Sequence, residues 1–304
     1  MDVALRLEAT LGEGPRWDAA GRRLLAVDIE GRRLHRFDPA TGEDRPLHLG
    51  ERIGVALPVE GGGLLLALAR RLAVLDEAAN RMETLAAFPH GDDVRANDGA
   101  CDPAGRLFVG TMALDERPGG GALYRYTAEA GLERVLDAVT LSNGLGWSPD
   151  GTRMYYVDSP TRRVDVFDYD PASGEPGARR PFARIAAEDG IPDGLAVDDE
   201  GGVWVALYGG GAVRRFDADG RLDRVLEVPA TNVTACCFGG PDGRSLFVTT
   251  ARQGLGEAEL EREPLAGSVF VADAGVAGPP ATPFAHGGGT RSTAPSEADE
   301  TSAR

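Results

Sequence analysis

Four side chains that carry oxygen atoms stand at the same place in a repeated sequence pattern. Glu13, Asn97, Asn143 and Asp193 each lie eight residues before the glycine of a D-x-x-G-like turn. Two carboxylates and two carboxamides at equivalent places in a repeat fold can converge on one point. Converging carboxylates repel each other unless a cation lies between them. The residue types therefore predict a site for a divalent ion that is bound through oxygen atoms.

A local role for these residues is the alternative. Asn-Gly and Asp-Gly pairs are common in turns, so the pairs at 97–99, 143–144 and 193–194 could each be a simple turn. Three such pairs in one register, with Glu13-Gly14-Pro15 in a fourth repeat, favour a shared ligand site over separate turns.

The kind of ion follows from the donor atoms. The histidines lie outside the register; they are His35, His48, His90 and His286. An all-oxygen set suits a hard or borderline ion such as Ca²⁺, Mg²⁺ or Mn²⁺ better than a structural zinc ion. Three or four protein oxygens also leave coordination positions for water and substrate, which is typical of a catalytic site.

The turn glycines define the elements that must position these residues. They are Gly21, Gly62, Gly105, Gly151, Gly201 and Gly243, and neighbours are 41, 43, 46, 50 and 42 residues apart. This spacing is the size of one four-stranded propeller blade. Strand-like segments at 33–38, 71–76, 164–168 and 212–217 keep the same register. The sequence thus predicts an all-β, six-bladed β-propeller whose central channel holds the metal site at its mouth.

The two ends of the chain have different predicted roles. The segment 3–7 is strand-like and left over by the repeats, so we expect it to complete the outer edge of the last blade. One propeller domain would then span residues 1–285. Residues 286–304 are rich in Gly, Thr, Ser, Ala and Pro and lack apolar side chains to bury, which predicts a disordered tail.

Composition excludes several classes of function. The net charge of −16 argues against nucleic acid and anionic membrane partners, and no apolar segment is long enough to span a bilayer. All 32 basic residues are arginine, so Schiff-base lysine chemistry is excluded. Cys101, Cys236 and Cys237 are too few for a disulfide framework or a zinc cluster. We expect a soluble cytoplasmic protein, monomeric or weakly homo-oligomeric.

Several strings resemble a known family. Residues 11–15, 95–99, 141–145 and 191–195 read L-G-E-G-P, R-A-N-D-G, L-S-N-G-L and I-P-D-G-L. The strings C-D-P-A-G-R from Cys101, Y-Y-V-D-S from Tyr155 and C-C-F-G-G from Cys236 accompany them. In this order they resemble the regucalcin/gluconolactonase/luciferin-regenerating-enzyme family of sugar lactonases, over about residues 7 to 284.

The resemblance implies roles for individual residues. One divalent ion would be held by Glu13, Asn143 and Asp193, with Ca²⁺, Zn²⁺, Mn²⁺, Mg²⁺ and Fe²⁺ all left open. Arg95 and Asn97 would contact the substrate. An acidic residue shortly after Gly110-Thr111-Met112 would also reach the sugar; that residue is Asp115.

The implied reaction is the hydrolysis of a sugar lactone, of the 1,5- or 1,4-gluconolactone type, to its aldonic acid. A metal-polarised carbonyl needs no serine or cysteine nucleophile, and no G-x-S-x-G motif occurs. Asp193 is the expected proton-handling group as well as a ligand. The alternatives are an aryl-ester or phosphotriester hydrolase on the same fold, a non-enzymatic calcium-binding propeller and, for Arg95, a surface ion pair with nearby aspartates.

Overall fold

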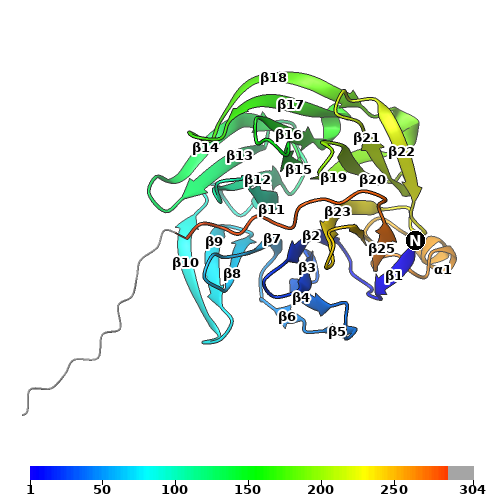
Figure 1. Cartoon of the computed structure of the whole chain (residues 1–304). Coiled ribbons are helices and arrows are strands. Elements are labelled where there is room, and N and C mark those ends of the chain that lie inside the picture. The colour runs from blue at the N-terminus through cyan, green and yellow to red at the C-terminus, as the bar shows by residue number, and fades with distance from the viewer. Residues whose placement is uncertain (287–304) are drawn as a thin grey trace, which may run out of the picture.

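Each sequence repeat forms one antiparallel sheet, and the six sheets stand around a central axis (Figure 1). The computed structural model describes residues 1–286, so all but the first residue of the predicted disordered tail lies outside the described residues. The predicted all-β, six-bladed propeller is confirmed. The third strands of the first, second, fourth and fifth blades lie where the sequence register places them.

The blades follow one another along the chain, each from its inner to its outer strand. The first blade comprises β2 (Gly12–Asp18), β3 (Arg23–Asp28), β4 (Arg33–Asp38), β5 (Glu43–Asp44) and β6 (Leu47–His48). The second comprises β7 (Ile53–Pro58), β8 (Leu64–Leu68), β9 (Arg71–Asp76) and β10 (Arg81–Ala87). The third comprises β11 (Val94–Cys101), β12 (Leu107–Ala113), β13 (Gly121–Thr127) and β14 (Gly131–Val139). The fourth blade comprises β15 (Ser142–Trp147), β16 (Arg153–Asp158), β17 (Arg163–Asp170) and β18 (Glu175–Arg184). The fifth comprises β19 (Ile191–Val197), β20 (Val203–Tyr208), β21 (Ala212–Phe216) and β22 (Leu222–Glu227). The sixth comprises β23 (Val233–Gly239), β24 (Ser245–Thr250), β25 (Val269–Asp273) and β1 (Asp2–Leu5).

The first blade departs from the four-stranded pattern at its outer edge. Two short strands, β5 and β6, both pair with β4 in place of one continuous strand. Pro46 lies between them. Proline has no backbone N–H to donate to a neighbouring strand, which explains why the outer strand is interrupted there.

The N-terminal strand closes the ring, as the sequence predicts. β1 pairs antiparallel with β25, with Asp2 opposite Val271 and Leu5 opposite Val269. Its observed limits, Asp2–Leu5, begin one residue before the predicted segment and end two residues earlier. Figure 1 shows the N-terminus beside β25. The last blade is therefore built from both ends of the chain.

The core lies between adjacent blades. Leu65 and Leu72 of the second blade, for example, share one apolar cluster with Leu107 and Tyr124 of the third. Each sheet buries both faces in this way, so the inner strands are held rigidly around the channel.

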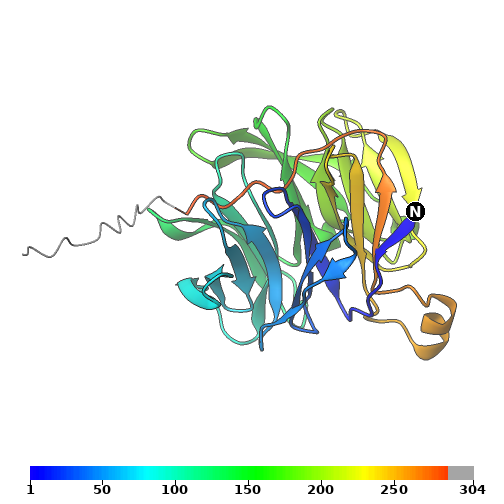
Figure 2. The ribbon, with the colours of Figure 1, turned by 60° about the horizontal axis from the view of Figure 1, so that its bottom comes forward.

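The C-terminal segment crosses one face of the ring (Figures 1 and 2). We call residues 277–285 the strap. Its hydrogen bonds reach Asp199, Trp17 and Gly105, which belong to the fifth, first and third blades. Asp199 and Gly105 follow the ends of inner strands, so the strap covers the channel end at which these strands finish. The candidate residues lie at the other end of the channel, where the inner strands begin.

The described part of the chain has three short helices between strands: η1 (Ser159–Thr161), η2 (Ala187–Asp189) and α1 (Glu257–Arg262). In Figure 2, α1 projects on the side of the ring away from the strap. Within residues 1–286, no helix has the length and apolar character needed to cross a membrane.

Candidate functional site

The inner strands share an irregularity at the candidate position. The register of β2 shifts between Glu13 and Arg16, that of β15 between Ser142 and Leu145, and that of β19 between Pro192 and Leu195. β11 shifts in the same way between residues 96 and 99. The Asn-Gly and Asp-Gly pairs are thus strand irregularities of the bulge type and do not connect two strands, so the simple-turn interpretation is wrong. Such irregularities re-aim side chains, here towards the channel.

The glycines after Asn143 and Asp193 let the next inner strand approach closely. A Cβ atom on Gly144 would lie 2.7 Å from the backbone oxygen of Asp193, and one on Gly194 would lie 2.4 Å from Cβ of Ala235. Any larger residue would push neighbouring blades apart. The glycines therefore contract the ring around the candidate side chains.

One cavity of about 170 Å³ at the start of the inner strands is lined by five of the six predicted site residues. They are Glu13, Arg95, Asn97, Asn143 and Asp193, and each is buried. The cavity is also lined by Glu116, Ser159 and Tyr208, for which the sequence predicts no role. Of these, Ser159 stood within the family-like string Y-Y-V-D-S, the signal that could have pointed to it.

Both carboxyl groups of the site have a raised pKa, because burial and neighbouring negative charges disfavour their ionised forms. Burial, then the nearby charge of Asp98, raises the pKa of Glu13. Burial, then the charge of Glu13, raises the pKa of Asp193 well above its ordinary value. Oδ1 of Asp193 is buried without a hydrogen-bond partner among the described residues. A buried carboxylate oxygen without a partner is uncommon in folded proteins and indicates that a ligand is needed there.

The amides of the site form a continuous hydrogen-bond chain. An N–H of Arg95 donates to Oδ1 of Asn97 at 2.6 Å, and Nδ2 of Asn97 donates to Oδ1 of Asn143 at 2.7 Å. Nδ2 of Asn143 then donates to Oγ of Ser159 at 2.7 Å. Oγ of Ser159 donates to the carbonyl oxygen of Pro192, again at 2.7 Å. The chain joins the third, fourth and fifth blades and ends beside Asp193.

Arg95 is a buried site residue and not a surface ion-pair partner. Each of the three aspartates near it in sequence pairs with another arginine: Arg70 with Asp92, Arg117 with Asp93, and Arg16 with Asp98. Nη1 of Arg95 donates to the carbonyl of Ala96 and to Asn97. Its Nε and Nη2 groups have no protein acceptor within residues 1–286, which leaves them for a ligand.

Asp115 does not join the other five residues. Its side chain is 64% exposed and accepts a hydrogen bond from Arg117. The next residue, Glu116, lines the cavity instead and has a left-handed backbone with φ of 53°. A non-glycine residue in this conformation is unusual, and such strain is often found at functional sites.

The donor set fits a hard divalent ion. Among residues 1–286, no group of three or more His, Cys, Asp and Glu side chains is arranged to hold a metal. The cavity instead combines the carboxylates of Glu13 and Asp193 with the amide oxygen of Asn143. Oxygen donors of both types are those that Ca²⁺, Mg²⁺ and Mn²⁺ prefer. The unpartnered Oδ1 of Asp193 is the observation that favours an ion here.

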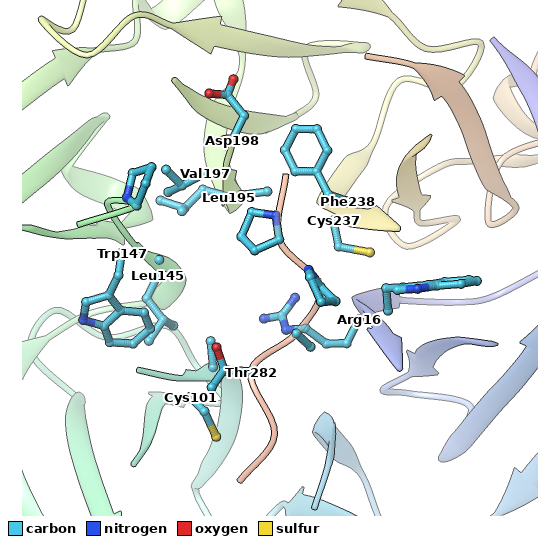
Figure 3. Close-up of a pocket in the computed structure, with 18 of the residues that line it drawn as sticks. Arg16, Cys101, Leu145, Trp147, Leu195, Val197, Asp198, Cys237, Phe238 and Thr282 are labelled. Carbon is cyan, nitrogen blue, oxygen red and sulfur yellow. The ribbon is translucent and has the colours of Figure 1, made fainter. Parts of the chain in front are cut away.

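A larger pocket of about 330 Å³ lies beneath the strap (Figure 3). It is lined mainly by apolar groups such as Trp147 and Phe238 and by none of the predicted site residues. Cys101 and Cys237 also line it, and burial raises the pKa of both thiols. A thiol that stays protonated is a poor nucleophile, so this pocket offers no cysteine chemistry.

We expect metal-free protein to lose stability as the pH rises. Burial raises the pKa of Glu13 from 4.5 to about 8, so the folded protein holds a proton that the unfolded chain has released. This contribution is complete below the unfolded pKa and is lost as the pH rises through the folded pKa. Thermal melts of chelator-treated protein between about pH 5 and pH 8.5 should show it. The Glu13→Gln variant should have a flatter profile, and identical profiles would contradict the assignment.

The ring and this cavity define the class of the protein: a six-bladed β-propeller with an acidic, amide-lined site at one channel mouth. The chain belongs to the family described as "SMP-30/Gluconolactonase/LRE-like region", whose model matches residues 11–252. The predicted family membership is thereby confirmed.

Relatives of known name match nearly the whole chain. Regucalcin of Gallus gallus is 39% identical over 283 residues, which cover 90% of this chain and 95% of that protein. A Bacillus subtilis (strain 168) protein provisionally named a sugar lactone lactonase is 34% identical over 289 residues, covering 94% and 99%. The structure of the calcium-binding protein regucalcin from Agrobacterium tumefaciens strain C58 superposes with a TM-score of 0.90 at 29% identity, covering 93% and 96%.

Proposed function

We propose that this protein hydrolyses a sugar lactone to its aldonic acid with the help of one divalent metal ion, and that the 170 Å³ cavity is the active site. The observation that carries the proposal is the buried, unpartnered Oδ1 of Asp193 beside Glu13. Membership of a family named for gluconolactonase and similarity to a provisionally named sugar lactone lactonase support the choice of substrate.

Glu13, Asn143 and Asp193 hold the ion in this proposal. When bound, the ion supplies Lewis acidity that polarises the lactone carbonyl. Its positive charge also offsets the repulsion between the two carboxylates. Asn143 contributes a neutral oxygen, so the three side chains together carry a charge that a divalent ion balances.

Asp193 also handles the proton. Its carboxylate accepts a proton from the attacking water and returns it to the ring oxygen that leaves. The net result is that a C–O bond forms to water, the C–O bond of the ring breaks, and the acid is released. No covalent enzyme intermediate is needed, which agrees with the protonated state of the buried cysteines.

Arg95 and Asn97 orient the sugar through different groups. The free Nε and Nη2 groups of Arg95 donate to hydroxyls or to the developing carboxylate. Both N–H groups of Asn97 are already used, by the carbonyl of Ser142 and by Asn143. Asn97 therefore contacts substrate only as an acceptor, through the remaining lone pair of Oδ1.

The deciding experiment is a pH-indicator assay of acid release from glucono-1,5-lactone. Chelator-stripped protein is compared with the spontaneous rate, without added ions and with Ca²⁺, Mn²⁺, Zn²⁺ or Mg²⁺. Turnover that returns with at least one ion supports the proposal. No acceleration with any ion or related lactone would favour an aryl-ester or phosphotriester hydrolase, or a binding role such as that in the name of the Agrobacterium relative.

We expect Glu116, and not Asp115, to be the acidic residue that binds the sugar. The Glu116→Gln variant should raise KM by roughly tenfold with little change in kcat, since a hydrogen bond to a charged group is lost. The matched Asp115→Asn variant should leave both parameters unchanged, because its carboxylate faces solvent and Arg117. The reverse pattern would restore Asp115 to the role that the family resemblance gives it.

A further inference from the structure

The groups at the two ends of the hydrogen-bond chain fix which atom donates and which accepts at each step of the chain. The Arg95 guanidinium can only donate, and the carbonyl of Pro192 can only accept. Ser159 has one hydroxyl proton and uses it on Pro192, so it presents only lone pairs to Asn143. Asn143 must therefore turn its NH₂ group towards Ser159 and its Oδ1 the other way.

Ser159 is well placed to impose this orientation. It is 3% exposed and begins η1, directly after β16. Its backbone N–H donates to the carbonyl of Leu141, two residues before Asn143. The hydroxyl is therefore fixed relative to the strand start that carries Asn143, independently of its own hydrogen bonds.

We propose that Ser159 is a positioning residue that holds the Asn143 amide with its oxygen available to the metal. This inference rests on the proposed metal-dependent function. Without the hydroxyl, no other group within residues 1–286 accepts a hydrogen bond from Nδ2 of Asn143. Within the described part of the chain, only the hydrogen bond from Nδ2 of Asn97 to Oδ1 of Asn143 would then hold the amide. The amide could therefore rotate more easily and present NH₂ in place of oxygen, and an NH₂ group does not ligate a cation. Groups that orient ligands commonly contribute a 10- to 100-fold factor to metal affinity.

The test measures binding of Mn²⁺ and Ca²⁺ to chelator-stripped, full-length protein by calorimetry, with no need for turnover. We expect Ser159→Ala to weaken ion binding by about tenfold or more. Ser159→Thr keeps the hydroxyl and should restore most of the affinity. Ser268→Ala is the matched control, because Ser268 is an equally buried serine whose hydroxyl bonds to Leu7 in the sixth blade. It should change the melting temperature without changing the Kd for the ions.

A double-mutant cycle separates orientation from general damage. In an Asn143→Asp background both side-chain positions are oxygen, so orientation no longer matters and adding Ser159→Ala should cost little or no ion affinity. An equal loss in both backgrounds would overturn the inference. Unchanged ion affinity in Ser159→Ala alone would also overturn it while leaving the proposed function intact. Wild-type protein that binds neither ion would overturn both.

Discussion

Asp193→Asn should lower kcat/KM for lactone hydrolysis by roughly 10³-fold, because it replaces a charged metal ligand with a neutral one and removes the general base. The same variant should raise the melting temperature of the metal-free protein. Asp193 is buried, its Oδ1 has no partner, and burial together with Glu13 raises its pKa. The neutral amide therefore removes the free-energy cost that the folded state bears for either burying this charge or binding a proton to neutralise it. Loss of activity with a gain in stability marks a residue kept for function.

Asp198→Asn is the matched control on the same blade. Asp198 is fully buried, and its carboxylate accepts hydrogen bonds from Gly202, Trp204 and Arg215. Its replacement should lower the melting temperature and leave kcat/KM near the wild-type value. Steady-state assays and thermal melts of both variants check the pair. Near-wild-type turnover in Asp193→Asn, or destabilisation like that of Asp198→Asn, would contradict the assigned role.

The fold could be predicted because a similar turn pattern recurs once in every blade. Strands at 33–38 and 71–76 match β4 and β9, since a short strand that ends at an Asp-containing turn looks alike in every blade. The interrupted outer strand of the first blade was not predicted. It depends on Pro46, a single residue outside the repeated pattern.

The candidate site was predictable to the extent that it follows the same register. Glu13, Asn143 and Asp193 start equivalent strands, so equal spacing places them together. Ser159 and Glu116 follow no such rule. Ser159 lies after a second strand, and its role depends on bonds to Asn143 and Pro192 that spacing does not encode. Glu116 faces the cavity because of its left-handed backbone. The number of residues between Met112 and an acidic side chain does not reveal this conformation.

The second large effect is expected from deletion of residues 1–8. These residues supply β1, whose pairing with β25 closes the ring. Leu5 and Leu7 also pack against the cluster that contains Trp17 and Phe247. Losing this apolar contact and the backbone bonds should lower the free energy of unfolding by roughly 5 kcal/mol. For a chain of this size, this corresponds to a melting temperature lower by roughly 10 °C.

Two further measurements test whether ring closure is the cause. Leu222→Ala removes an exposed leucine from β22, an outer strand that does not close the ring, and should change the melting temperature little. A synthetic peptide of residues 1–8, added in excess to the truncated protein, should bind beside β25 and restore stability by mass action. A scrambled peptide should not. An unchanged melting temperature after truncation would show that the first blade and the last hold together without β1, because their inner strands β2 and β23 already pack side by side.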